Sequence, residues 1–166
     1  MAALETGTAA PQFTLQTWDG RRFDLQEALS HGPVLLAFFK ISCPVCQFAF
    51  PYLERLYQSY RGKSSATVVG VSQNSKSETA TFLQQYGVTF PVLLDDTRSY
   101  PVSNAYGLTN VPTFFWIESD GEITLSSVGW VRKDIEQLNR LLAESGKLAP
   151  ASLFSPGENI PDYRPG

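Results

Sequence analysis

The chain has 166 residues, 43% of them hydrophobic, and a formal net charge of -3 at pH 7. This length suits one domain with a real core, and the acidic balance argues against nucleic acid as a partner, because phosphate binding needs clustered Lys and Arg. No apolar run approaches the ~18 residues that span a bilayer, and the first residues lack the charged and apolar regions of a signal peptide. We therefore expect a soluble cytoplasmic protein, or an exported one whose N-terminus has been trimmed.

Strands and helices alternate along the sequence. Residues 12–29 predict two short strands around a turn at Asp19-Gly20, followed by a short helix. The apolar run 33–41 has the length of a buried strand, and a helix follows it. Further along we expect a strand at 66–73, a helix at 75–86 with a Ser75–Glu78 capping box, a strand at 90–96, a short helix within 99–108 broken by Pro101, a hairpin at 112–130 and an amphipathic helix at 133–145. This order predicts an α/β fold whose central sheet is partly parallel and has helices on both faces.

The composition changes after Gly146. Four prolines in residues 147–166 exclude a helix there, so we predict a domain at 1–146 and an irregular Pro-rich tail at 147–166. The tail either serves as an interaction segment or only packs on the surface. The residues expected to attach it to the body are Leu153, Phe154, Ile160 and Tyr163.

The only two cysteines, Cys43 and Cys46, stand two residues apart between the apolar strand and the helix. They are candidates for a structural staple, half of a metal site, an inert pair of core thiols or a working dithiol. Zinc takes about four ligands, and with His31 as the only histidine a complete site would need a second chain or carboxylates. We therefore favour a working dithiol, with no metal and no cofactor.

The position of the cysteines has a chemical consequence. Ser42 or Cys43 would cap the helix, and Pro44 would occupy its first turn, where a missing N–H costs nothing. Cys43 would then lie at the positive end of the helix dipole, which favours a thiolate. Such a thiolate attacks a disulfide, and Cys46 resolves the mixed disulfide that results.

Several motifs in a fixed order resemble one family. "APQF", the strand before "CPVC", the proline Pro51 in the following helix and "VPT" at Val111 to Thr113 are similar to the TlpA/ResA-type thiol–disulfide oxidoreductases. These belong to the thioredoxin-fold redoxin superfamily, which is related to AhpC/TSA proteins. The similarity runs from about Ala10 to Gly146. It implies a thioredoxin-like three-layer α/β/α sandwich with a mixed central sheet and an N-terminal β-hairpin extension.

The resemblance also assigns roles to residues near the dithiol. It implies that Pro51 kinks the helix, although on propensity alone a helix could begin at Pro51. It implies that Pro112 is cis and faces the cysteines, so that the backbone of Val111 pairs with an extended substrate. The implied substrate-binding residues are Pro44, Val45, Val111 and Pro112.

The sequence also departs from the family pattern. Ser42 replaces the usual Trp, and Ala37 stands where thioredoxin has a buried Asp that helps to move the proton of the resolving cysteine. Lys40 is a charged candidate for tuning the thiol pKa, or else a strand-end lysine that points into solvent.

The resulting prediction is an enzyme that exchanges disulfides of proteins or small molecules and works with a dithiol reductant or oxidant as its partner. A thiol peroxidase is the first alternative, although Lys40 stands where its motif needs Thr, and Arg98 or Arg132 would have to supply the cation. The second alternative is a non-catalytic redox-sensing or client-binding module.

Overall fold

The computed structural model of the chain describes residues 3–166. Its strands are β1 (Thr14–Gln16), β2 (Arg22–Asp24), β3 (Val34–Phe39), β4 (Thr67–Ser72), β5 (Val92–Leu94), β6 (Thr113–Ile117), β7 (Ile123–Val128), β8 (Trp130–Val131) and β9 (Tyr163–Arg164). Its helices are α1 (Leu25–Leu29), α2 (Pro44–Tyr60), α3 (Lys76–Tyr86), α4 (Pro101–Ala105) and α5 (Arg132–Ser145). The sequence reasoning predicted these elements apart from the short strands β8 and β9.

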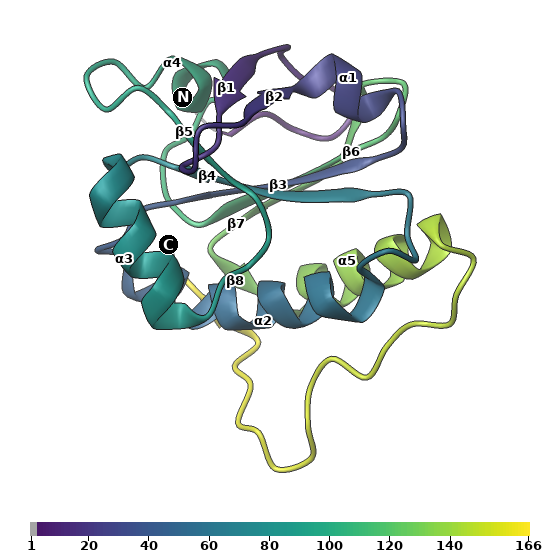
Figure 1. Ribbon diagram of the computed structural model, residues 1–166. Helices are drawn as coiled ribbons and strands as arrows, with labels where there is room; N and C mark the ends of the chain where they lie inside the picture. The colour runs from purple at the N-terminus through teal and green to yellow at the C-terminus, as the bar shows by residue number, and fades with distance from the viewer. Residues whose placement is uncertain (1–2) are drawn as a thin grey trace.

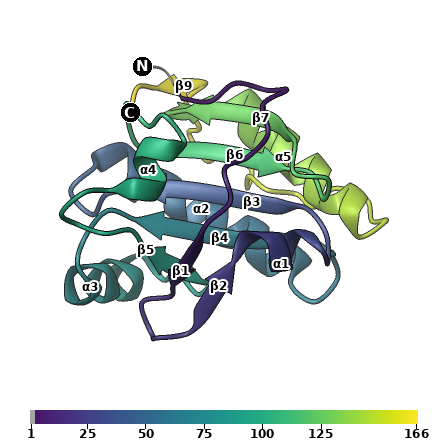
Figure 2. The ribbon, with the colours of Figure 1, turned by 90° about the horizontal axis from the view of Figure 1, so that it is seen from above.

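A five-stranded mixed sheet in the order β5-β4-β3-β6-β7 forms the middle layer (Figure 2). β3, β4 and β5 are parallel, since the chain returns through α2 and α3 between them, whereas β6 is antiparallel to β3 and β7 is antiparallel to β6. The central position of β3 explains its unbroken apolar sequence, because all six of its residues are buried. Leu35, Ala37 and Phe39 belong to the hydrophobic cluster on one side of the sheet, and the alternate residues belong to the cluster on the other side.

Helices cover both faces of this sheet (Figure 1). α2, α3 and α5 form the layer on one face, and α1, α4 and the β1–β2 hairpin form the layer on the other. Each face has its own cluster of buried side chains. The predicted three-layer sandwich with a mixed central sheet and an N-terminal hairpin is therefore confirmed.

The helix ends show why the local sequence folds in this way. α2 begins at Pro44 and contains Pro51, so the alternative of a helix that begins at Pro51 is wrong. α3 has the predicted capping box between Ser75 and Glu78. α4 begins at Pro101, which corrects the prediction that this proline breaks the helix; proline suits a first helical position because the N–H it lacks has no helical partner there.

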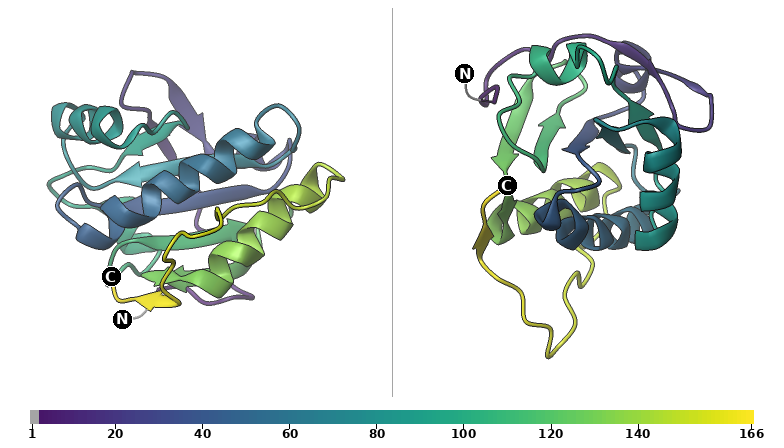
Figure 3. Two further views of the ribbon diagram at one scale, coloured as in Figure 1. Left: turned by 90° about the horizontal axis from the view of Figure 1, so that it is seen from below. Right: turned by 90° about the vertical axis from the view of Figure 1, so that its left-hand side faces the viewer.

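Residues 147–166 form a segment that we call the C-terminal strap. It leaves α5 and runs back along the α2–α5 layer (yellow in Figures 1 and 3). Leu153 is buried in the body's hydrophobic cluster, and the ring of Phe154 packs edge-on against Trp130 at 6.3 Å between centroids. Ile160 packs against the same cluster, whereas Tyr163 is 60% exposed and attaches the strap through the pairing of its backbone with Val131.

Polar contacts hold the C-terminal strap as well. The guanidinium of Arg55 donates two hydrogen bonds, of 2.7 and 2.8 Å, to the carboxylate of Glu158. The indole N–H of Trp130 donates to the carbonyl of Pro161 at 2.8 Å. β9 at the end of the strap pairs with β8, which corrects the expectation of a wholly irregular tail. The domain boundary at Gly146 stays a prediction.

Candidate active site

The two cysteines lie where the central strand passes into α2. The chain leaves the buried end of β3 at Phe39, and Cys43 then caps α2 with Pro44 as the first helical residue. Cys46 follows within the first turn, and its backbone N–H donates to the Cys43 sulfur at 3.1 Å. This is the arrangement expected from the spacing, with Cys43 rather than Ser42 as the cap.

Cys43 is half-buried, and its surroundings favour the ionised sulfur. The pKa of Cys43 is lowered from 9.0 to about 6, mainly because the Cys46 side chain hydrogen-bonds to it and also because the backbone N–H groups of Cys46 and Val45 face it. Desolvation opposes these effects, and the charge of Arg164 adds to them. At neutral pH Cys43 is therefore mostly a thiolate, which is the nucleophilic form.

Cys46 has the opposite environment. Its side chain is fully buried among the apolar residues of the α2 face, and burial raises the pKa of this thiol far above its usual range. The two sulfurs thus differ in both exposure and ionisation. Cys43 can meet a substrate as a thiolate, while Cys46 is held as a protonated thiol behind it.

The loop before β6 faces Cys43 from the other side. The Val111–Pro112 peptide bond is cis. The Cys43 sulfur lies 3.4 Å from the carbonyl oxygen of Val111, which accepts its proton when Cys43 is in the thiol form. Pro112 is buried and Val111 is half-buried. The hydroxyl of Thr113 closes the loop by donating to the carbonyl of Asn110 at 2.8 Å.

A groove of about 460 Å³ opens beside the Cys43 sulfur, and we call it the Cys43 groove. Of the predicted substrate-binding residues, Pro44 and Val111 line it, whereas Val45 and Pro112 lie buried beside it. Residues of α4 line it as well, and so does Gly166 of the C-terminal strap. The lining residues that the sequence reasoning missed include Gln73, Tyr100, Ser103, Asn104, Asn110 and Gly166.

Lys40 lines the same groove and is exposed. The side-chain charge that lowers the pKa of Cys43 is that of Arg164. The tuning role of Lys40 stays a prediction.

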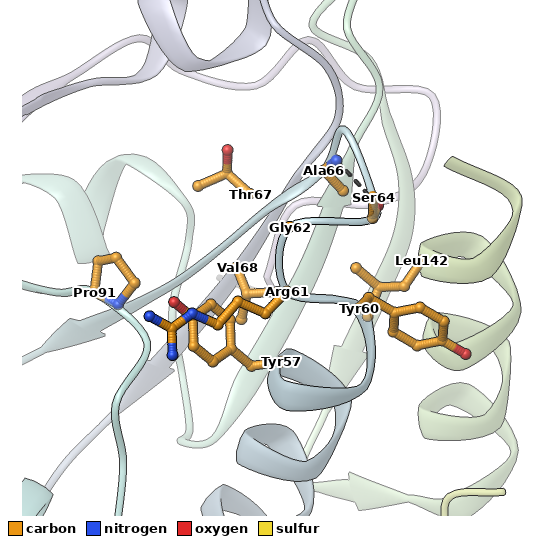
Figure 4. A pocket seen from close by; sticks show the side chains of 10 residues that line it. All are labelled: Tyr57, Tyr60, Arg61, Gly62, Ser64, Ala66, Thr67, Val68, Pro91 and Leu142. Carbon is orange, nitrogen blue, oxygen red and sulfur yellow. Dashed lines mark hydrogen bonds between the residues drawn. The ribbon is translucent and has the colours of Figure 1, made fainter. Parts of the chain in front are cut away.

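Another cavity, of about 220 Å³, lies at the opposite end of α2 (Figure 4). Tyr57, Arg61 and Leu142 are among the residues that line it. A helix of 17 residues is about 25 Å long, so this cavity is remote from the dithiol. It takes no part in the chemistry of Cys43.

Comparison with known proteins decides the family. The model of the AhpC/TSA family matches residues 6–126, which is most of the chain and includes both cysteines and the cis-proline loop. The chain belongs to the AhpC/TSA family.

Several relatives of this chain are named thiol–disulfide oxidoreductases. The protein named thiol-disulfide oxidoreductase ResA from Geobacillus thermodenitrificans is 33% identical over 137 residues, which cover 81% of this chain and 76% of that protein. Its namesake from Bacillus subtilis is 32% identical over 121 residues, which cover 73% of this chain and 66% of that protein, slightly under two thirds. A putative thiol:disulfide interchange protein DsbE from Chlorobium tepidum superposes with a TM-score of 0.74 at 27% identity, covering 86% of this chain and 99% of that one.

These comparisons confirm two predictions about this AhpC/TSA-family chain. Its fold is thioredoxin-like, and it is an enzyme of the thiol–disulfide oxidoreductase class. None of the helices within residues 3–166 has the length and hydrophobicity to cross a membrane.

The structure locates one departure from the family pattern, Ala37, and the two arginines considered for the thiol peroxidase alternative. Ala37 is fully buried in β3, in the hydrophobic cluster that also contains Cys46. The cations considered for a peroxide site are occupied elsewhere: Arg98 is paired with Asp96, and Arg132 with Glu136. Neither arginine lines the Cys43 groove.

Proposed function

We propose that this thiol–disulfide oxidoreductase works through Cys43 as the attacking thiolate and Cys46 as the resolving thiol. The observation that carries the proposal is the contrast between the two sulfurs. Cys43 is accessible, and backbone N–H groups face it, whereas Cys46 is buried and protonated one turn further along α2. This contrast assigns the order of the two steps.

In the first step the Cys43 thiolate attacks one sulfur of a substrate disulfide. A mixed disulfide forms between Cys43 and that sulfur, and the other substrate sulfur leaves as a thiolate that takes up a proton. In the second step Cys46 loses its proton and attacks Cys43, which releases the first substrate sulfur. The substrate disulfide is then reduced to two thiols, and Cys43–Cys46 is oxidised to a disulfide, which a dithiol partner reduces again.

The same chemistry runs in reverse when the partner is a stronger oxidant. The surroundings that lower the pKa of Cys43 stabilise the reduced dithiol, and a stabilised reduced form makes a dithiol more oxidising. We therefore place the reduction potential above the value of about -270 mV typical of thioredoxin. A cytoplasmic location stays a prediction.

An extended disulfide-bearing segment fits the Cys43 groove. The Val111 backbone lies beside the Cys43 sulfur, where a substrate strand can pair with it. Pro44 and residues of α4 line the space that substrate side chains would occupy. Protein disulfides and small disulfides such as oxidised glutathione are the proposed substrate class.

The test is to compare Cys43→Ser, Cys46→Ser and the double variant. Cys43→Ser should abolish reduction of insulin disulfides, because the nucleophile is gone. Cys46→Ser should accumulate mixed disulfides with the substrate, visible as a mass increase that dithiothreitol removes, and the double variant should show none. Rapid peroxide consumption without disulfide exchange in the unmodified protein would instead favour a peroxidase and overturn the proposal.

A further inference from the structure

The C-terminal strap contains a positively charged residue, Arg164, that lies near the start of α2. β9 pairs with β8 in an antiparallel register that sets Arg164 opposite Trp130. Gly129, just before β8, has φ +78, and a Cβ there would lie 2.6 Å from the carbonyl oxygen of Arg164. The backbone of Arg164 is thus held against the body at a point where only glycine fits.

The end of the C-terminal strap touches the loop that faces the dithiol. The side chain of Asn110 donates to the carbonyl of Gly166 at 3.3 Å. A Cβ on Gly166 would lie 2.5 Å from the Val111 carbonyl oxygen, which is the atom that accepts from the Cys43 thiol. The strap therefore reaches the immediate neighbours of the reacting sulfur.

The guanidinium of Arg164 lies over the ring of Phe48, 4.9 Å from its centroid. Phe48 is in the second turn of α2, so the cation sits beside the N-terminal end of this helix. That end carries the positive pole of the helix dipole, so the dipole and the charge of Arg164 both favour an anion there. The Cys43 sulfur, as the helix cap, is the group at that place which can become an anion.

Other titratable or charged side chains also surround Cys43. They are Cys46 on its own helix, Lys40 before it and Tyr100 at the start of α4, in addition to Arg164 from β9. The charge of Arg164 acts on Cys43 in the direction of the thiolate.

We propose that Arg164, delivered by the C-terminal strap, is a positioning residue of the dithiol whose positive charge holds the Cys43 sulfur in its attacking form. The inference rests on the proposed role of Cys43 as nucleophile. It gives the strap a part in the reaction beyond packing. The match to the family model ends at residue 126, so Arg164 and the C-terminal strap lie outside the matched range.

The test measures the rate of Cys43 alkylation by iodoacetamide against pH, in full-length reduced protein. Arg164→Gln removes the charge and keeps a long polar side chain, and Arg164→Lys keeps the charge. Arg61→Gln is the matched control, because the Arg61 guanidinium also lies over an aromatic ring, that of Tyr57 at 5.9 Å, but at the opposite end of α2. Each variant is also checked for its thermal unfolding midpoint.

Arg164→Gln should slow alkylation at pH 6 by about two- to fivefold, because an opposite charge nearby favours the ionised form. Arg164→Lys should restore most of the rate, and Arg61→Gln should leave it unchanged. In 1 M salt the difference between the unmodified protein and Arg164→Gln should shrink, because the Debye length falls to about 3 Å and Arg164 is only half-buried. A structural role would produce no such salt dependence.

The proposal is overturned if the pH profile of Cys43 alkylation in Arg164→Gln equals that of the unmodified protein. It is also overturned if Arg164→Lys slows alkylation as much as Arg164→Gln does while both variants unfold at a lower temperature. These outcomes are separate from the proposed function. If Cys43→Ser still abolishes insulin reduction, the function stands and only the role of Arg164 fails. If Cys43→Ser remains active, the function fails, whatever Arg164 does to the thiol.

Discussion

The hydrogen bond between the two cysteine side chains makes the largest contribution to the low pKa of Cys43, and Cys46→Ala removes it. A hydrogen bond to a charged group contributes roughly 1.5–3 kcal/mol. Since S–H is a weak donor, we take the lower end, which corresponds to about one pKa unit. The pKa of Cys43, about 6 in the unmodified protein, should therefore rise to about 7 in Cys46→Ala.

The assay is the pH profile of Cys43 alkylation in the reduced protein. At pH 6 the thiolate fraction should fall from about one half to about one tenth, which is a fivefold loss of rate. Cys46→Ser is the matched control, because its hydroxyl still donates to the Cys43 sulfur. If the Ala and Ser variants both titrate like the unmodified protein, the side chain of Cys46 does not stabilise the thiolate, and the reasoning from the hydrogen bonds is refuted.

Three further predictions concern stability and the C-terminal strap. The pKa of Cys43 is lower in the folded protein than in the unfolded chain, so its contribution to stability is complete above pH 9 and is lost as pH falls through 6. The free energy of unfolding of the reduced protein, measured by urea titration, should rise between these values by at most about 1.4 kcal/mol per pH unit before solvent screening reduces the effect, and Cys43→Ser should lack this rise. Leu153→Ala should cost about 2–3 kcal/mol in the free energy of unfolding, because it empties a buried site; a loss under about 0.5 kcal/mol would show that the strap is not anchored there. Gly129→Ala should displace β9, since its Cβ would meet the Arg164 carbonyl at 2.6 Å; limited proteolysis should then cut the strap faster than in the unmodified protein, and equal rates would contradict the close approach.

Local sequence signals predicted the dithiol and its scaffold well. The spacing of Cys43 and Cys46, with Pro44 between them, predicted a helix start at the cysteines. The apolar run at 33–41, interrupted only by Lys40, predicted a buried strand, and β3 is that strand. Signals of this kind work because capping and hydrophobic periodicity act over a few residues.

Contacts between distant segments were beyond the same reasoning. Nothing in the sequence around Arg164 indicates that it lies over Phe48, because that contact depends on the path of the whole C-terminal strap. The α4 wall of the Cys43 groove was missed for the same reason. Tyr163 was predicted to attach the strap because it is large and apolar, yet β-pairing of its backbone holds it while its side chain faces solvent.

The path of the C-terminal strap has a practical consequence for anyone who handles the protein. Gly166 lines the Cys43 groove, so any linker or purification tag fused behind it would leave the molecule within reach of an incoming disulfide. A hexahistidine extension there would bring imidazoles next to the reactive sulfur and distort kinetic measurements.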